Sequence, residues 1–377
     1  MEEKKYEYWL HRLPKAGNST IRELLRRYHT PSEVYEAVKR KSKGALEVLN
    51  EDRFPEAAAF TNGYDLNGEY EQMLQKGIRM LTERDTDYPD RLRTIPSPPY
   101  GLYVLGQLPS EDVPTVAMIG ARDCSEYGIY VARHFARELG LHGIPVISGM
   151  ARGIDSISQE AALQSGGKTY AVLGCGVDIC YPKSSRNLYE QILDQGGVLS
   201  TFPPGTEPIK RLFPERNRIV SGLADVVLVV EARQKSGTFI TVDMALEQGR
   251  EVYAIPGRLT DRLSDGCNLL LQQGALIAVS PKDLLRHLEP KQLDFSLENG
   301  AWKDSIHGKN PKEQQLAALC SVLDFLPLSV EEIKLRYVKK QKAAITTQEL
   351  LFLLMDLCME GYAVQVSSSY FVRKNSE

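Results

Sequence analysis

Val116-Ala-Met-Ile-Gly-Ala-Arg-Asp-Cys-Ser-Glu-Tyr-Gly128 is the stretch of sequence that decides the fold. Its first four residues form an apolar run typical of a buried strand, and Gly120 allows a sharp turn directly after it. Ser125 is placed to cap a helix expected over residues 127–141. The exposed amides of such a turn and the positive end of the helix dipole favour a phosphate, and Arg122 adds a full charge. The same turn is equally typical of a purely structural element in a doubly wound domain.

Short apolar segments alternate with helix-length segments from Val116 to about His287. This alternation predicts an α/β fold, with a Rossmann-like, doubly wound parallel sheet and helices on both faces. The expected strands are 116–119, 145–148, 169–173, 198–200, 226–231, 252–255 and 276–279. Ligands of such sheets bind outside the carboxyl ends of the strands, so we expect the residues that follow each strand to gather at one edge.

Two regions precede and enter this core. Residues 1–80 read as a small helical domain of the SAM or helix-hairpin-helix type, with a turn at residues 15–18 and a further helix at residues 69–76. The turn could contact a DNA phosphate, but its lone glycine favours a packing domain. The proline-rich segment at residues 85–99 is expected to be an ordered connector that lies along a core spanning residues 81–290.

Two further regions follow the core. Residues 291–311 are polar with little periodicity and predict a linker. Residues 312–377 predict three helices and a hairpin, the order of elements in a winged-helix domain. Its basic residues could meet DNA phosphates or form a solvated face, and both interpretations remain open.

The composition is that of a soluble globular protein: 377 residues, 42% hydrophobic and 25% charged. A net charge of −3 means that a polyanion would have to bind a local basic patch. The sequence has no apolar run of membrane-spanning length, and its start lacks the features of a signal peptide, so we expect a cytoplasmic protein without membrane association. The six cysteines are scattered, without Cys-x-x-Cys pairs or histidines at metal spacing, which predicts reduced thiols and neither a metal nor a disulfide.

The segments after the expected strands share glycines and basic side chains. One glycine turn could be packing, but this many turns at one edge predict a phosphate-rich ligand. Neither the glycine pattern of a dinucleotide site nor a kinase-like phosphate loop is present, so no nucleotide cofactor is expected. The positively charged residues of these segments are Arg122, Arg152, Lys183, Arg216, Arg218 and Arg233.

Three carboxylates in these segments, Asp155, Asp178 and Glu231, could form an acid–base set. Capping helices and holding arginines is the simpler role for them, because a carboxylate beside a helix N-terminus is stabilised without any chemistry. We therefore expect a binding site with no catalytic residue. Aromatic side chains near the basic positions could stack on bases or belong to the core. These are Tyr127, Tyr181, Phe202 and Phe213.

These segments together resemble the DNA-processing protein A (DprA, also called Smf) family. The matching motifs, in the family order, are Ile119-Gly-Ala-Arg122 with Ser125-Glu-Tyr-Gly128, Val146-Ile-Ser-Gly-Met-Ala-Arg-Gly-Ile-Asp155, Gly166-Gly-Lys-Thr-Tyr-Ala-Val-Leu-Gly-Cys-Gly-Val-Asp178, Tyr181-Pro-Lys183, Phe202-Pro-Pro-Gly-Thr206, Phe213-Pro-Glu-Arg-Asn-Arg-Ile-Val-Ser-Gly222, Glu231-Ala with Ser236-Gly-Thr238, and Gly249-Arg-Glu-Val-Tyr-Ala-Ile-Pro-Gly257. They cover the whole central domain, and the flanking regions are also similar to those of the family.

The resemblance implies a protein without enzymatic activity that binds and protects single-stranded DNA and helps to load the RecA recombinase during natural transformation. It also implies a homodimer formed through the central domain. Arg122 and Lys183 match family positions that contact single-stranded DNA. The remaining residues that match motifs around the DNA pocket are Gly120, Ser125, Gly149, Arg152, Asn217, Arg218, Gly237 and Thr238.

The chain departs from the family pattern at three positions. Gln159 replaces a usual histidine, Thr201 a usual glutamate, and Ser185 an expected asparagine. We expect all three positions to lie at the rim of the pocket, and Arg122 and Lys183 themselves keep the residue types of the family.

Two other functions remain as alternatives. One is a nucleotide-processing hydrolase of the lysine-decarboxylase-like class, although Ser236-Gly-Thr238 lacks the paired glycines of that signature. The other is a transcriptional regulator that reads duplex DNA with the C-terminal domain.

Overall fold

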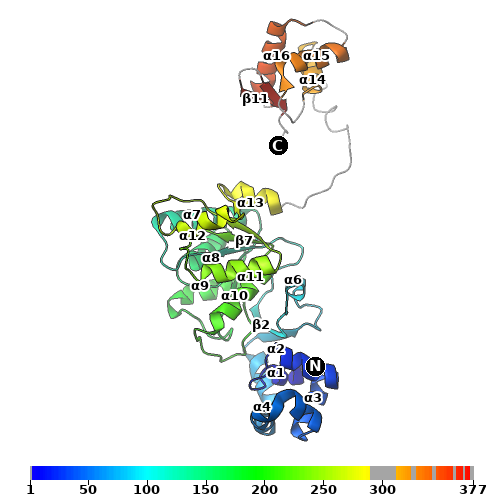
Figure 1. Cartoon of the computed structure of the whole chain (residues 1–377), viewed down its shortest axis with the longest axis vertical. Helices are drawn as coiled ribbons and strands as arrows, with labels where there is room; N and C mark the ends of the chain where they lie inside the picture. Colours follow the sequence, from blue (N-terminus) through cyan, green and yellow to red (C-terminus); the bar gives the residue numbers. More distant parts are fainter. Residues whose placement is uncertain are drawn as a thin grey trace. The chain divides into compact units, whose positions relative to one another are not determined.

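The computed structural model of the chain describes residues 2–288, 311–323, 328–341, 345–359, 362–367 and 370–373 (Figure 1). The chain divides into two compact units, Met1–Pro290 and Lys291–Glu377. Apart from Pro311, the expected linker at residues 291–311 lies outside the described residues.

Five helices open the first unit: α1 (Glu2–His11), α2 (Asn18–Tyr28), α3 (Pro31–Lys39), α4 (Lys43–Gly63) and α5 (Leu66–Gln75). The expected turn at residues 15–18 lies between α1 and α2. Trp9, Leu10 and Leu24 are fully buried. They share one hydrophobic cluster with sheet residues such as Tyr103 and Val198, so these helices pack onto the core of the sheet. Helix α4 was not predicted, because the pattern is broken by a kink at Asn50 and by Pro55 inside the helix.

A nine-stranded sheet forms the centre of the first unit, in the order β1-β2-β6-β5-β4-β3-β7-β8-β9. The seven predicted strands are present and run parallel to one another. They are β3 (Val116–Ile119), β4 (Val146–Ser148), β5 (Thr169–Val172), β6 (Gly197–Ser200), β7 (Val226–Val229), β8 (Glu251–Ala254) and β9 (Leu276–Ile277).

The prediction of a purely parallel sheet is wrong at one edge. β1 (Ile78–Thr82) pairs antiparallel with β2 (Gly101–Gly106), and β2 pairs antiparallel with β6. Because β1 starts at Ile78, the sheet begins before the proline-rich connector does. The connector, residues 85–99, lies between these two strands in the sequence.

Helices cover both faces of the sheet, as predicted (Figure 1). Successive residues of β3 point to opposite faces: Val116 and Met118 join a core with α7 (Glu126–Leu141), α8 (Ile154–Gln164) and α13 (Pro281–Leu288). Ala117 and Ile119 join a second core, whose helices are α10 (Leu212–Gly222), α11 (Thr238–Glu247) and α12 (Asp265–Gln272). The apolar run of β3 is therefore explained by burial on both sides.

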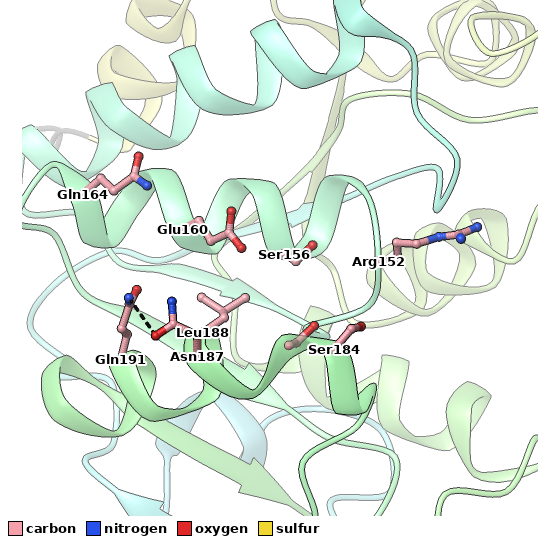
Figure 2. A pocket seen from close by; sticks show the side chains of 9 residues that line it. Arg152, Ser156, Glu160, Gln164, Ser184, Asn187, Leu188 and Gln191 are labelled. Atoms are coloured by element: carbon pink, nitrogen blue, oxygen red, sulfur yellow. Dashed lines mark hydrogen bonds between the residues drawn. The ribbon is translucent and has the colours of Figure 1, made fainter.

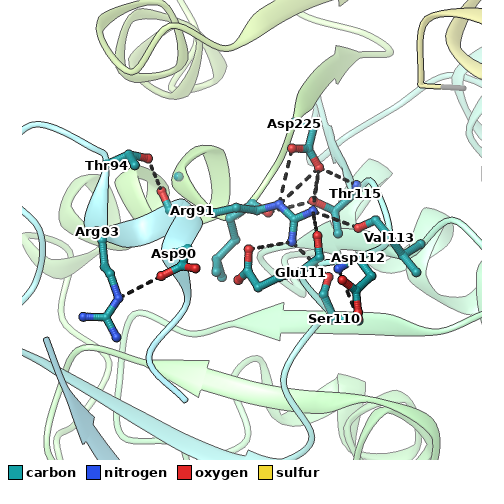
Figure 3. Close-up of polar contacts among 12 residues, drawn as sticks. Asp90, Arg91, Arg93, Thr94, Ser110, Glu111, Asp112, Val113, Thr115 and Asp225 are labelled. Atoms are coloured by element: carbon teal, nitrogen blue, oxygen red, sulfur yellow. Dashed lines mark hydrogen bonds and ion pairs between the residues drawn. The ribbon is translucent and has the colours of Figure 1, made fainter. Parts of the chain in front are cut away.

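The connector is ordered and lies against the core, as expected. It contains the short helix α6 (Asp90–Arg93), and the Tyr88 hydroxyl donates to the Pro99 carbonyl at 2.7 Å. Figure 3 shows that Arg91 donates to the Asp225 carboxylate at 3.2 and 3.3 Å and to the Val113 carbonyl at 2.8 Å. Asp225 in turn accepts from the Thr115 amide at 2.7 Å. Asp225 and Thr115 precede β7 and β3, so this network fixes the amino-terminal edge of the sheet.

The described residues of the second unit form three helices and three short strands. The helices are α14 (Pro311–Cys320), α15 (Val330–Gln341) and α16 (Thr347–Met359), and the strands β10 (Leu328–Ser329), β11 (Ala363–Ser367) and β12 (Tyr370–Arg373) pair antiparallel in the order β10-β12-β11. Ile333, Leu350, Leu354 and Phe371 are fully buried in its core. This matches the three helices and the hairpin expected from the sequence.

Within the described residues, no helix combines the length and apolar character needed to span a membrane. The six cysteines lie in the described part of the chain, and none of them forms a disulfide.

Candidate nucleic-acid interface

The carboxyl ends of β5, β4, β3 and β7 lie next to one another at one edge of the sheet. Arg122 follows β3, Gly149 and Arg152 follow β4, Lys183 ends the loop after β5, and Gly237 and Thr238 follow β7. Sequence reasoning therefore selected segments that the fold brings to one place.

The N-terminus of α7 is capped as predicted, with the Ser125 hydroxyl accepting from the Gly128 amide at 3.1 Å. The carboxylate of Glu231, only 1% exposed, accepts from the Ser125 amide at 2.9 Å and from the Ser125 hydroxyl. The anion position expected at this helix end is therefore filled by the protein's own carboxylate. Glu231 has the structural role that the sequence favoured, since it ties the end of β7 to α7.

Gly120 is required for close packing. A Cβ atom at residue 120 would lie 2.7 Å from Cγ1 of Ile154 and 3.0 Å from the Glu231 carbonyl. Gly153, with φ +87°, packs against the carbonyls of Ala121 and Arg122. The turns after β3 and β4 are thus in direct backbone contact.

Arg122 and Arg152 differ in whether their charge is free to meet a ligand. Both are exposed, but Arg152 forms an ion pair with Asp123. Arg122 has no hydrogen-bond or ion-pair partner within the part of the chain that the structure describes. Arg122 is therefore the free cation of these two turns.

Arg216 does not contribute an exposed charge, which corrects the sequence interpretation. It is 4% exposed, and its Nη1 donates to the carbonyls of Gly149 at 2.6 Å and Val172 at 2.7 Å. Burial lowers the pKa of Arg216 because it disfavours the charged guanidinium. The negative charge of Asp155 raises this pKa, and the positive charge of Arg122 lowers it further. The neighbouring Asn217 and Arg218 are partly buried on α10.

Asp155 lies close enough to the buried guanidinium of Arg216 for their charges to interact. Its carboxylate accepts from the Gly149 amide at 3.1 Å. Burial raises the pKa of Asp155, while Arg216 and the surrounding hydrogen bonds lower it. Asp155 thus holds a turn and an arginine in place, as the sequence favoured.

The loop after β5 is fixed by Asp178. Its carboxylate accepts from Nζ of Lys76 and from the Gly205 amide, both at 2.8 Å. Burial raises the pKa of Asp178, but these hydrogen bonds outweigh it and bring the pKa below 3.8. Sequence reasoning missed this link between the N-terminal helices and the candidate site, because its partners lie far apart in the chain.

Lys183 begins the short 3-10 helix Lys183–Ser185 directly before α9 (Arg186–Gln195). Its side chain is exposed and has no partner among the residues that the structure describes. Ser184 and Ser185 line a hollow together with Arg152 (Figure 2). The segment of Lys183 and the turn after β4 therefore border the same part of the surface.

Two of the four aromatic candidates, Tyr127 and Tyr181, are exposed, and Tyr181 lies two residues before Lys183. Tyr181 is 42% exposed, and its ring centroid lies 5.7 Å from that of Phe213. The Arg216 guanidinium lies 5.8 Å from the centroid of the same Phe213 ring. Phe202 is only 8% exposed and belongs to the core, and the Tyr127 hydroxyl donates to the Pro256 carbonyl at 3.1 Å. The stacking interpretation is therefore wrong for Phe202 and fits Tyr181 best.

Gly237 and Thr238 lie at the start of α11. Gly237 is exposed and has φ −61°, and a Cβ atom at residue 237 would meet no other atom within 4 Å. Neither backbone conformation nor space therefore requires glycine at this position.

Gln159 does not lie at the rim of the site, which corrects our expectation. It is fully buried, and its Nε2 donates to the Tyr170 carbonyl at 3.1 Å, close to the start of β5. Thr201 is partly buried with its hydroxyl unpartnered, and Ser185 lines the hollow. The three departures thus have different surroundings.

Across the described residues, His, Cys, Asp and Glu side chains form no cluster that could hold a metal ion.

A family model described as DNA recombination-mediator protein A matches residues 79–289. The DNA processing protein DprA of Streptococcus pneumoniae is 43% identical over 205 residues, which is 54% of this chain and 72% of that protein. The protein Smf of Escherichia coli is 35% identical over 284 residues, 75% of this chain and 74% of that protein.

Two solved structures extend the similarity to the fold. The X-ray structure of DprA from Streptococcus pneumoniae superimposes with a TM-score of 0.66 at 34% identity, covering 76% of this chain and 98% of that one. A structure of DNA processing protein A from Helicobacter pylori, described for its single-stranded DNA binding mode, gives a TM-score of 0.51 at 32% identity, covering 56% of this chain and 95% of that one.

Proposed function

This chain belongs to the DNA recombination-mediator protein A family, and from that premise we propose that it binds single-stranded DNA at the carboxyl edge of its sheet. The observation that carries the proposal is that Arg122 and Lys183, both exposed and unpaired among the described residues, lie at that edge with the exposed ring of Tyr181. Cations that follow phosphates and a ring on which bases stack are what binding without sequence preference requires.

The other site residues would support this contact in different ways. Gly120 and Gly149 keep the turns close together, Ser125 fixes the helix beside Arg122, and Arg152 adds charge when a phosphate displaces Asp123. The remaining proposed contacts are Asn217, Arg218, Gly237 and Thr238.

The site acts by binding in this proposal, with no turnover of the DNA. Asp155, Asp178 and Glu231 are each held by structural hydrogen bonds, which supports positioning roles for these carboxylates. Nucleoside monophosphates incubated with the protein should therefore stay intact. Released base would favour the hydrolase instead.

We further propose that the protein works in the cytoplasm as a mediator that protects incoming single strands and loads RecA on them during natural transformation. In a strand-exchange assay with a single-strand-binding protein present, the chain should shorten the lag before RecA acts. The Arg122→Glu variant should lose this effect.

We also propose that the protein forms a homodimer through the sheet of its first unit. The edge strand β9 carries two exposed apolar side chains, Leu276 at 41% and Ile277 at 52%, and Val279 shortly after it is 70% exposed. Such an edge favours pairing with a second copy. Light scattering should give a dimer for the wild type and a monomer for Ile277→Asp.

We also infer that the second unit is a winged-helix domain, since its three helices and antiparallel strands follow the order of that fold. Whether this domain adds duplex binding is settled by the same experiment that tests the main proposal.

That experiment is a gel shift with single- and double-stranded oligonucleotides of one sequence. The wild type should prefer the single strand, and Arg122→Glu should lose most of its affinity. Arg40→Glu is the matched control, because it makes the same change of charge on an exposed arginine at the C-terminal end of α3. Equal binding of single and double strands by wild type and Arg122→Glu would contradict the proposal.

A further inference from the structure

A hollow of about 480 Å³ opens between α8 and α9 (Figure 2). This volume lies within the roughly 300–1,000 Å³ of sites for small organic groups. Its lining residues come from the turn after β4, from α8, and from the segment that follows Lys183. They are Arg152, Ser156, Glu160, Gln164, Ser184, Ser185, Asn187, Leu188 and Gln191.

The lining suits a flat group with polar edges. Leu188 is the apolar residue of the nine, and the other eight carry hydrogen-bonding side chains. Asn187 and Gln191 are hydrogen-bonded to each other at 3.4 Å. Glu160 is exposed, and within the described residues neither a hydrogen bond nor an ion pair engages its carboxylate. A nucleobase has apolar faces and donors or acceptors along its edge, and proteins read unstacked bases of single strands in this way.

The hollow borders the proposed path of the single strand. Arg152 lies in the turn that packs against the backbone of Arg122, and Ser184 and Ser185 directly follow Lys183. A strand whose phosphates meet Arg122 and Lys183 therefore passes the mouth of the hollow. Inside the hollow Glu160 would repel an anion, while the lining cation Arg152 is paired with Asp123.

We propose that this hollow receives an unstacked guanine of bound single-stranded DNA, with Glu160 as the acceptor for its base edge. A carboxylate only accepts hydrogen bonds. Guanine places two donors, N1–H and N2–H, side by side on its Watson–Crick edge, whereas adenine, cytosine and thymine each place an acceptor beside their donor there. The hollow thus gives a guanine preference to an otherwise sequence-tolerant site, and this inference rests on the proposed function.

The test measures fluorescence anisotropy of the full chain with four labelled oligonucleotides: an all-thymine strand, and the same strand with its central thymine block replaced by guanine, hypoxanthine or cytosine. The wild type should bind the guanine strand about tenfold more tightly than the all-thymine strand, as a good bidentate contact provides. Hypoxanthine lacks the N2 amino group and should lose most of that gain. Glu160→Gln should abolish the preference, so that its affinities for the guanine and all-thymine strands agree within about twofold, while Glu247→Gln, at an exposed glutamate on α11, should keep it.

Three results would overturn the inference. Equal affinity of the wild type for all four strands would remove the preference itself. A preference that persists in Glu160→Gln would place it elsewhere, and an equal gain for every strand in Glu160→Gln would show that Glu160 only repels phosphates. In these three cases the proposed function still stands. A wild-type protein that binds none of the strands would contradict both the guanine preference and the proposed function.

Discussion

The guanidinium of Arg216 donates a 2.6 Å hydrogen bond to the carbonyl oxygen of Gly149 and occupies the space that a side chain at residue 149 would need. Arg216 also donates to Val172, at the end of the neighbouring strand β5. A buried cation thus holds the ends of β4 and β5 at a fixed separation beneath the proposed DNA site. Its own charge is not available to a ligand.

Gly149→Ala should destabilise the first unit by about 1–3 kcal/mol, because the new methyl group must displace a buried guanidinium. Urea denaturation measures the change. Gly237→Ala is the matched control, since its side chain meets no atom within 4 Å, and it should change stability by less than about 0.5 kcal/mol. Equal effects at the two glycines would refute the packing role of Gly149.

Tyr181→Ala should weaken single-strand binding about 5- to 150-fold, since stacking of one base on an aromatic ring contributes about 1–3 kcal/mol. Tyr181→Phe should bind like the wild type because it keeps the ring. Tyr130→Ala removes a tyrosine that is 68% exposed on α7 and should have little effect. Anisotropy titrations with a thymine oligonucleotide measure all three, and a Tyr181→Ala protein with wild-type affinity would rule out the stacking role.

Asp178→Asn should lower the free energy of unfolding near neutral pH by about 0.5–1 kcal/mol, since Lys76 is partly exposed and the ion pair is screened. The folded-state pKa of Asp178 lies below its ordinary value of 3.8, so its contribution is complete above that value and is lost as the pH falls through the folded-state pKa. Urea denaturation at several pH values should therefore show a constant difference between wild type and variant down to about pH 5 and a shrinking one below about pH 4. A difference that grows on acidification would contradict this assignment.

The segment from Val116 to Leu141 could be predicted from sequence because each of its steps is local. An apolar run gives β3, Gly120 permits the turn, and the Ser125 hydroxyl caps the amide three residues on. Strand β2 also carries a signal, the apolar run from Leu102 to Leu105, that could have found it. Its antiparallel attachment to β6 depends on residues about a hundred positions away, which no local pattern encodes.

The exposure of the site residues could not be predicted for a similar reason. Arg216 and Arg218 are two positions apart in one motif, yet Arg216 is buried because its partners Gly149 and Val172 come from other strands. Phe202 and Tyr181 both follow strands, but Phe202 is 8% exposed and Tyr181 42%. Residue type and spacing identified segments that the fold brings to one edge of the sheet, whereas tertiary contacts decide which side chains are free there.

The central claim is that Arg122 and Lys183 contact phosphates of one bound strand. The salt dependence of binding tests it most directly, because each phosphate contact on a single strand contributes about 0.7 to the slope of log affinity against log salt concentration. We predict that Arg122→Gln and Lys183→Gln each reduce the magnitude of the slope by about 0.7, and that the double variant reduces it by about 1.4. A double variant with the wild-type slope would contradict the account.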